Sequence, residues 1–192
     1  MIGLVPNMRV YERTSGVGAD NKYVQLLVEI ANYCIEKLGA SVLLSPNEIK
    51  VPGKTGQDDR FLCGIIQLLI NKNEYCFTIR EYYPSEIIKS IVSHVDLLIA
   101  SRFHSLVFAL SSEIPVMALG WSHKYVELLR PFGLSDYVCS HDQLDQTAVL
   151  NMLNKAWVER ENNKNRIGDV LPAIQKDVDT MFDLVAEVIK SS

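Results

Sequence analysis

The stretch DLLIASRFHSLVFALSSEIPVMAL, residues Asp96–Leu119, holds two short apolar runs separated by about one helix length. Apart from Asp96 at the start, the runs DLLIA and PVMAL are continuously apolar and do not alternate with polar residues. Such runs are typical of central strands in a parallel sheet that is covered on both faces. The segment between them, His104–Ser112, is predicted to be a helix. The stretch therefore predicts a strand, a helix and a second strand parallel to the first.

The rest of the chain repeats this alternation of short apolar runs and amphipathic segments. Apolar runs predict four further strands, at Ile2–Pro6, Ser41–Ser45, Tyr75–Ile79 and Tyr137–Cys139. Helical spacing of apolar residues predicts helices at Asn21–Leu38, Asp58–Ile70, from Pro84 onward, Lys124–Phe132, Asp145–Asn162 and about Ile167–Lys190. This order predicts an α/β fold over residues 1–192: one Rossmann-like domain with a doubly wound parallel sheet and long C-terminal helices.

Two Gly- and Pro-rich segments, Glu12–Asp20 and Pro46–Gln57, are predicted to be loops. Both follow strand ends, which favours ligand-covering segments slightly over tolerated insertions. The paired acids Asp58–Asp59 are interpreted as charges at a helix N-terminus and not as catalysts.

Composition excludes several classes of protein. The 192 residues are 48% hydrophobic and 22% charged, with a net charge of −4. This balance is that of a globular protein and disfavours nucleic-acid binding. The four cysteines form no C-x-x-C pair and are interpreted as buried free thiols, which fits a cytoplasmic setting. No apolar run approaches the ~18 residues that span a bilayer. The abrupt start on MIGLVP suggests a piece of something longer.

Polar residues collect after the predicted strands. Ligands of open parallel sheets bind at the carboxyl ends of the strands. The residues expected at this edge are Asn7, Arg9, Asn47, Arg80, Arg102, His104, Ser122, His123 and Lys124. For Arg9, a solvated loop position is favoured over a ligand contact. For His123 and Lys124, ordinary surface charge at a helix start is an equal alternative.

Arg102 and His104 stand out because they interrupt an apolar stretch. Ser101 is expected to cap the following helix, which places Arg102 at the strand end and His104 in the first helical turn. A helix N-terminus attracts anions, arginine binds carboxylates and phosphates, and histidine transfers protons near neutral pH. The alternative has equal weight: Arg102 pairs with an acidic neighbour, and His104 only caps or packs.

The segments VPNMRVYER and PSEIIKSIVSHVDLLIASRFHSLVFALSSEIPVMALGWSHKY, together with the helical tail, resemble the polysaccharide pyruvyl transferase family. The similarity is strongest from Pro84 to Gly133. The resemblance implies a glycosyltransferase-B-like architecture, in which two Rossmann-like domains face each other across a cleft. This chain matches the C-terminal domain, and the N-terminal domain is absent from it.

Members of this family transfer a pyruvyl group from phosphoenolpyruvate to two hydroxyls of one sugar. The product is a cyclic ketal in a cell-surface polysaccharide or exopolysaccharide. By the resemblance, Arg102 and His104 are the catalytic residues of the donor site, with His104 as general acid or base. The substrate-binding residues are expected to be Asn7, Arg9, Ser101, Ser105, Gly120, Ser122, His123 and Lys124. The scheme needs no metal and no cofactor, since phosphoenolpyruvate is the donor substrate.

The resemblance also implies partners and a location. The expected partners are phosphoenolpyruvate, a sugar or lipid-linked saccharide acceptor, the N-terminal domain and a second copy of the chain. Acceptor recognition would lie largely on the N-terminal domain. The expected location is the cytoplasm, including the inner face of the membrane.

Two alternatives stay open. One is a glycosyltransferase domain that uses a nucleotide sugar, with Arg102 and Lys124 on its diphosphate. No acidic residue is clearly placed for a ribose contact, which counts mildly against it. The other is a truncated, non-catalytic binding module.

Overall fold

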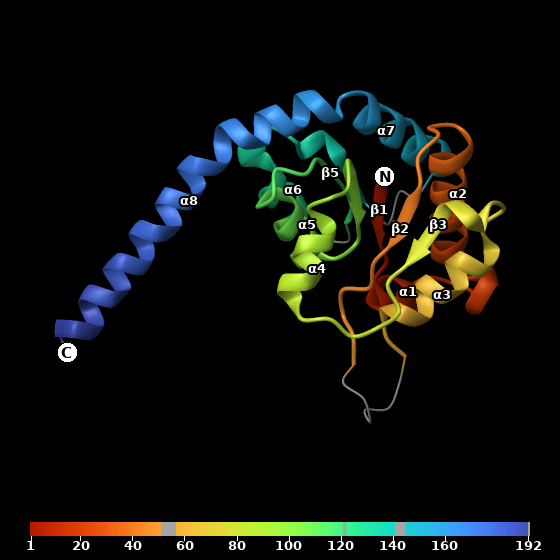
Figure 1. The fold of residues 1–192 in the computed structure, drawn as a ribbon, viewed down its shortest axis with the longest axis horizontal. Helices are drawn as coiled ribbons and strands as arrows, with labels where there is room; N and C mark the ends of the chain where they lie inside the picture. The colour runs from red at the N-terminus through yellow and green to blue at the C-terminus, as the bar shows by residue number, and fades with distance from the viewer. Residues whose placement is uncertain (51–56, 121, 141–144, 192) are drawn as a thin grey trace.

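The computed structural model describes residues 1–50, 57–120, 122–140 and 145–191. Its centre is one sheet of six strands (Figure 1). The strands are β1 (Ile2–Val5), β2 (Val42–Leu44), β3 (Cys76–Thr78), β4 (Leu97–Ala100), β5 (Val116–Gly120) and β6 (Val138–Ser140). Each strand begins and ends within one residue of the apolar run that predicts it. The α/β prediction is therefore confirmed.

The strand order is β3-β2-β1-β4-β5-β6, and every pair of neighbours is parallel. The chain builds the sheet outward from β1 to β3, returns to the centre at β4, and continues in the other direction. Val5 and Ala100, the last residues of β1 and β4, are register partners. Connections that leave neighbouring strands toward opposite faces of a sheet create a crevice at the strands' carboxyl ends. The order therefore places the expected ligand site beyond Val5 and Ala100.

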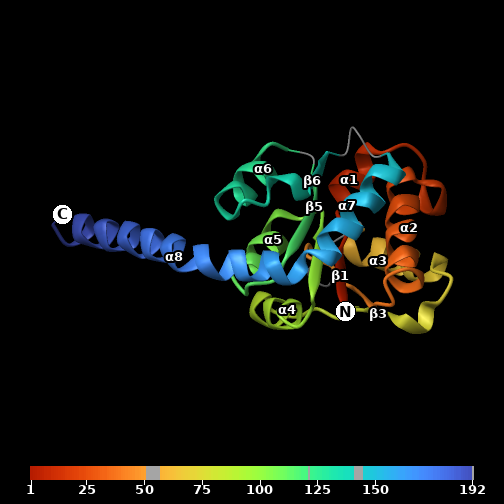
Figure 2. The ribbon, with the colours of Figure 1, turned by 90° about the horizontal axis from the view of Figure 1, so that it is seen from above.

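Helices cover both faces of the sheet. They are α1 (Met8–Arg13), α2 (Lys22–Glu36), α3 (Asp59–Leu69), α4 (Ser85–Val92), α5 (Phe103–Leu110), α6 (Lys124–Leu129), α7 (Gln146–Val158) and α8 (Arg160–Ser191). Short 3-10 turns are η1 (Gly18–Asp20), η2 (Asn73–Tyr75), η3 (Arg130–Phe132) and η4 (Ser135–Tyr137). Figure 2 shows α1, α2 and α3 on one side of the strands and α4, α5 and α6 on the other.

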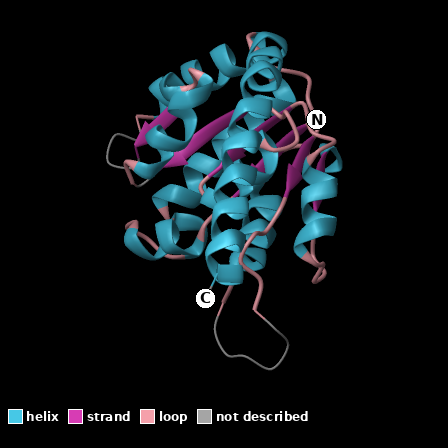
Figure 3. Cartoon of the chain, turned by 90° about the vertical axis from the view of Figure 1, so that its left-hand side faces the viewer, coloured by secondary structure: helices cyan, strands magenta, loops and turns pink. Residues whose placement is uncertain are grey.

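The core consists of the strands and the helix faces that pack on them. In Figure 3 the strands lie between helices. All four residues of β4 are completely buried. This burial confirms that DLLIA is a central strand, and its continuous apolarity follows from being covered on both sides.

Two helices differ from the prediction. Helix α1 lies partly in the predicted loop Glu12–Asp20; with six residues it is too short to show a helical period. Its start is fixed by Asn7, whose side chain accepts a hydrogen bond from the N–H of Arg9. Helix α8 begins at Arg160, within the range predicted for the preceding helix, and continues through Pro172. The polar stretch after Arg160 carries no apolar period, so the sequence pattern could not place this junction.

Helix α8 extends away from the rest of the molecule (Figure 1). Val178, Met181, Val185 and Val188 share one face at helical spacing and are 41%, 57%, 52% and 64% exposed. None of the described helices combines the length and apolarity needed to cross a bilayer.

All four cysteines are buried thiols that form no disulfide, which confirms the interpretation from the sequence. Burial raises the pKa of Cys34 to about 12 and that of Cys76 to about 11. The reactive thiolate form is therefore scarce at neutral pH. The structure gives these residues a packing role in the core.

Candidate functional site at the carboxyl edge of the sheet

Arg102 follows β4, and its guanidinium binds two carboxylates from other parts of the chain. Its Nε and Nη2 donate to the two oxygens of Asp59 at 2.9 and 2.6 Å. Its Nη1 lies 2.7 Å from Oε2 of Glu48. The Arg102 side chain is only 13% exposed. Of the two alternatives for Arg102, the structure therefore shows pairing with acidic neighbours.

The charges around Arg102 do not favour an additional anion. Burial disfavours the charged guanidinium, but Asp59 and Glu48 outweigh burial and raise its pKa above the ordinary value. One positive charge faces two carboxylates, so the cluster as a whole is negative. Asp59 is completely buried, whereas the side chain of Glu48 is 44% exposed. Glu48 is therefore the carboxylate that can leave at low cost.

Asp59 connects several segments at this edge. Its Oδ1 accepts from the N–H of Met8 at 3.0 Å, and its Oδ2 accepts from the N–H groups of Asn47 and Glu48 at 3.2 and 2.8 Å. These bonds join the start of α1 and the segment after β2 to the first turn of α3. Together with Arg102, the carboxylate has five donors, which accounts for its complete burial.

The neighbouring Asp58 has the role that the sequence predicts for the pair. It is the N-cap of α3 and accepts from the N–H of Arg60 at 2.9 Å. Burial opposes its ionisation, but bonds from Arg60 and from the N–H of Lys50 outweigh burial and lower its pKa. For Asp59 the prediction is incomplete, because its partner Arg102 lies 43 positions away in the chain.

A buried hydrogen-bond network connects β1, β4 and α2. The amide Nδ2 of Asn7 and the hydroxyl of Tyr125 donate to the carbonyl of Ser101 at 2.7 and 3.0 Å. The hydroxyl of Tyr23 donates to Oγ of Ser101 at 2.7 Å and accepts from the N–H of Asn7 at 3.1 Å. Burial raises the pKa of Tyr23 above its ordinary value.

The prediction that Ser101 caps the next helix is wrong. Arg102 occupies the N-cap position of α5, and no described side chain caps this helix. The hydroxyl of Ser101 cannot serve as the cap because it faces Tyr23. Ser101 and Asn7 are 0% and 3% exposed, and both hold the ends of β4 and β1 together.

His104 lies in the first turn of α5 and is exposed. It lines a cavity of about 340 Å³ together with Asn47, Ile49, Tyr82, Tyr83, Ser85, Ile88 and Phe108. Tyr82 and Tyr83 were not predicted from the sequence as site residues. The sequence feature that could have identified them is that two aromatic residues stand directly before Pro84, in a segment that belongs to no predicted strand or helix.

The predicted residues after β5 lie around Tyr125. A Cβ added to Gly120 would meet the Tyr125 ring at 3.0 Å, so glycine makes room for that ring. His123 and Lys124 are exposed, and Ser122 is partly buried. The Nζ of Lys124 lies 4.9 Å from the centre of the Phe103 ring. Trp121, between the predicted residues Gly120 and Ser122, lies outside the described residues.

Two further residues that were predicted to bind substrate, Arg9 and Ser105, do not line the cavity beside His104. Arg9 is 62% exposed and forms an ion pair with Glu12 at 3.5 Å, as expected for a solvated position. Ser105 is only 2% exposed, on the buried side of α5.

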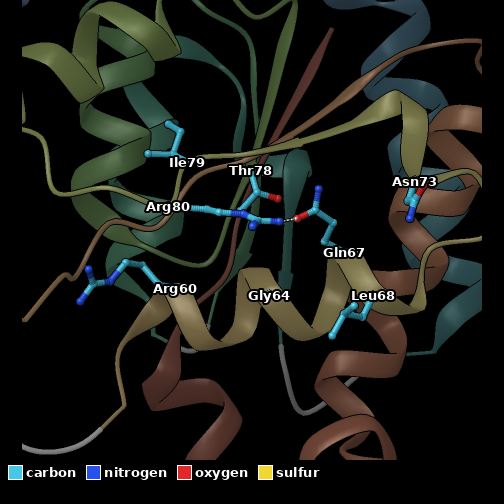
Figure 4. Close-up of a pocket in the computed structure, with 8 residues that line it drawn as sticks. All are labelled: Arg60, Gly64, Gln67, Leu68, Asn73, Thr78, Ile79 and Arg80. Carbon is cyan, nitrogen blue, oxygen red and sulfur yellow. Dashed lines mark hydrogen bonds between the residues drawn. The ribbon is translucent and has the colours of Figure 1, made fainter.

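A second cavity, of about 510 Å³, lies between α3 and β3 and includes Arg60, Thr78 and Arg80 (Figure 4). Arg80 donates to Oε1 of Gln67 at 3.0 Å. In Figure 4 the guanidinium of Arg60 points away from this pair. The guanidinium groups of Arg60 and Arg80 therefore do not point at one common position in the cavity. For this reason the cavity is not well suited to bind a single anion between them.

The comparisons with known proteins agree with the resemblance. A family model described as polysaccharide pyruvyl transferase matches residues 9–123, more than half of the chain. The matched range includes Arg102 and His104 after β4. A search of curated proteins found no match.

Proposed function

We propose, because this chain belongs to the polysaccharide pyruvyl transferase family, that it binds phosphoenolpyruvate and transfers its pyruvyl group to a sugar diol as a cyclic ketal. The observation that carries the proposal is the family match across β4 and α5, where Arg102 and His104 stand at the carboxyl edge of the sheet. We further propose that the Rossmann-like domain works opposite a second such domain, as the resemblance implies.

The proposed reaction is an addition followed by ring closure. A proton added to the methylene carbon of phosphoenolpyruvate makes the central carbon electrophilic. One sugar hydroxyl adds to that carbon and loses its proton, and the carbon–oxygen bond to phosphate breaks. The second hydroxyl then adds, loses its proton and closes the ring. The products are the cyclic ketal and inorganic phosphate.

His104 and the start of α5 are suited to this chemistry. His104 is exposed at a cavity and can move a proton between solvent, donor and acceptor. The first turn of α5 has no capping side chain among the described residues, so its backbone N–H groups are not taken up by a cap. Such donors favour an anionic oxygen. We assign the donor's carboxylate or phosphate to this helix start and to Arg102.

The donor must displace Glu48 in this proposal. The carboxylate of Glu48 holds Nη1 of Arg102 at 2.7 Å, where a donor carboxylate would bind. Exchange of the Glu48 carboxylate for the donor's carboxylate leaves the charge directly beside Arg102 unchanged. The donor's phosphate is then assigned to the backbone N–H groups at the start of α5. Asp59 stays in place throughout, since it is fully buried and holds the other side of the guanidinium.

The substitution Glu48→Gln is expected to tighten phosphoenolpyruvate binding about fivefold or more, because it removes both a competitor for Arg102 and a negative charge from the cluster. Isothermal titration measures the change. Glu74→Gln is the matched control, because Glu74 is an exposed acid in η2, before β3 and thus at the opposite edge of the sheet. Equal or weaker binding by Glu48→Gln would show that Glu48 does not compete with the donor.

Titration with phosphoenolpyruvate and with UDP-glucose tests the proposed function. We expect binding of phosphoenolpyruvate to the wild-type chain, and a loss of affinity of about tenfold or more in Arg102→Lys, which keeps the charge but loses the arginine fork. Circular dichroism checks that the variant is folded. A preference for UDP-glucose would refute the proposal and identify the nucleotide-sugar alternative.

A further inference from the structure

We propose that the cavity beside His104 binds one uncharged sugar ring and is an acceptor subsite of the proposed transferase, an inference that rests on the proposed function. It adds acceptor contacts on this domain to those expected on the N-terminal domain. The cavity has a volume of about 340 Å³. Ligand cavities commonly measure about 300–1,000 Å³, so this one suits a single ring better than a long oligosaccharide.

Two aromatic side chains line the cavity and are exposed to solvent. Tyr82 and Tyr83 are 58% and 41% exposed, and they directly precede Pro84 at the start of α4. Large aromatic groups held in solvent beside a cavity indicate a binding surface. A sugar ring has apolar C–H faces that pack on aromatic rings, and hydroxyls at its rim. Tyrosine offers both an apolar face and a polar tip.

The polar groups of the cavity suit hydroxyls and not anions. Asn47, Ser85 and His104 each carry groups that can donate and accept hydrogen bonds. Among the described residues, no Asp, Glu, Lys or Arg lines the cavity. Phosphoenolpyruvate carries two anionic groups and would find no permanent cation there. The chemistry of the lining therefore favours a neutral saccharide over the donor.

Two residues that line the cavity, Asn47 and Ile88, are held by buried parts of the fold. The N–H of Asn47 donates to buried Asp59 at 3.2 Å, which anchors the segment after β2. Ile88, which also lines the cavity, is 6% exposed and belongs to the core. A site on anchored residues loses little freedom when a ligand binds.

His104 connects the subsite to the proposed chemistry. It lines the cavity, and it follows Arg102 by two residues. Asn47 likewise lines the cavity and precedes Glu48, the partner of Arg102. A sugar in the cavity therefore lies next to the place where the donor is proposed to bind. This adjacency is what transfer between the two substrates requires.

Saturation-transfer NMR with methyl β-D-galactopyranoside, methyl β-D-glucopyranoside and methyl β-D-mannopyranoside tests the inference on the full chain. We expect at least one glycoside to bind with a dissociation constant in the millimolar range. Tyr82→Ala and Tyr83→Ala should each weaken this binding about tenfold, while Tyr82→Phe, which keeps the ring, retains most of it. Phosphoenolpyruvate binding, titrated on the same samples, should change less than about twofold.

Tyr75→Ala is the matched control, because Tyr75 is 49% exposed but lies before β3, away from the cavity. The absence of binding by every glycoside up to about 50 mM would overturn the inference. Binding that Tyr82→Ala and Tyr83→Ala leave unchanged would overturn it as well. Tyrosine-dependent glycoside binding without any phosphoenolpyruvate binding would instead refute the proposed function and support a saccharide site.

Discussion

Replacement of Asp59 by alanine is expected to lower the free energy of unfolding by about 3–5 kcal/mol. The carboxylate is completely buried and accepts hydrogen bonds from Arg102 and from the N–H groups of Met8, Asn47 and Glu48. Its removal leaves those three N–H groups without their acceptor and the guanidinium without its buried counter-charge. Urea denaturation followed by circular dichroism measures the loss.

The adjacent Asp58→Ala is the control for this experiment. Asp58 caps α3 and pairs with Arg60, whose side chain is 37% exposed and can turn to solvent, so the loss of Asp58 should cost only about 1 kcal/mol. The double variant Asp59→Ala/Arg102→Met should recover part of the stability, because it also removes the uncompensated cation. If Asp59→Ala costs no more than Asp58→Ala, the cluster does not hold the edge of the sheet together.

His104→Gln is expected to lower kcat for pyruvyl transfer by about 100- to 10,000-fold, the usual contribution of a general acid or base. Glutamine keeps a side chain that forms hydrogen bonds but cannot carry a proton at neutral pH. The acceptor-dependent release of phosphate from phosphoenolpyruvate measures the rate. Donor affinity should change less than about threefold if His104 acts mainly in the transition state.

His94→Gln is the matched control for His104. His94 is also exposed, but it lies between α4 and β4, at the amino edge of the sheet. We expect this variant to retain wild-type kcat, and both variants to retain wild-type unfolding energies. A kcat of His104→Gln within a factor of about three of wild type would remove His104 from the catalytic step.

The strands could be predicted because their signal is local. The residues LLIA of the run DLLIA form β4 and are fully buried, so one short apolar stretch indicates that both faces of the strand are covered. Helix α1 gave no such signal, since six residues do not complete a recognisable period. The start of α8 was missed for the opposite reason. Its first turns are polar, and Pro172 lies inside the helix where a break is normally expected.

The sequence predicted that Arg102 and His104 lie at the carboxyl edge of the sheet, where the structure has them, but it could not supply the internal partners of Arg102. The position of Arg102 and His104 after a buried strand follows from local pattern and parallel topology. The pairing of Arg102 with Asp59 depends on how β4 and α3 are arranged in space. Ser101 was predicted as a cap because serine favours that position, but Tyr23 from α2 occupies its hydroxyl. The partners of Arg102 and Ser101 are thus set by tertiary contacts, which local sequence preference does not reveal.

The exposure of α8 divides the molecule into parts of unequal local stability. Leu171 is 9% exposed and packs on the core, whereas every residue from Gln175 to Ile189 is exposed. A helical segment of about 15 residues that is exposed along its whole length is marginal in water. The outer turns of α8 should therefore fray from the C-terminus while the sheet stays folded. Their amide hydrogens should exchange with solvent well before those of β1 and β4.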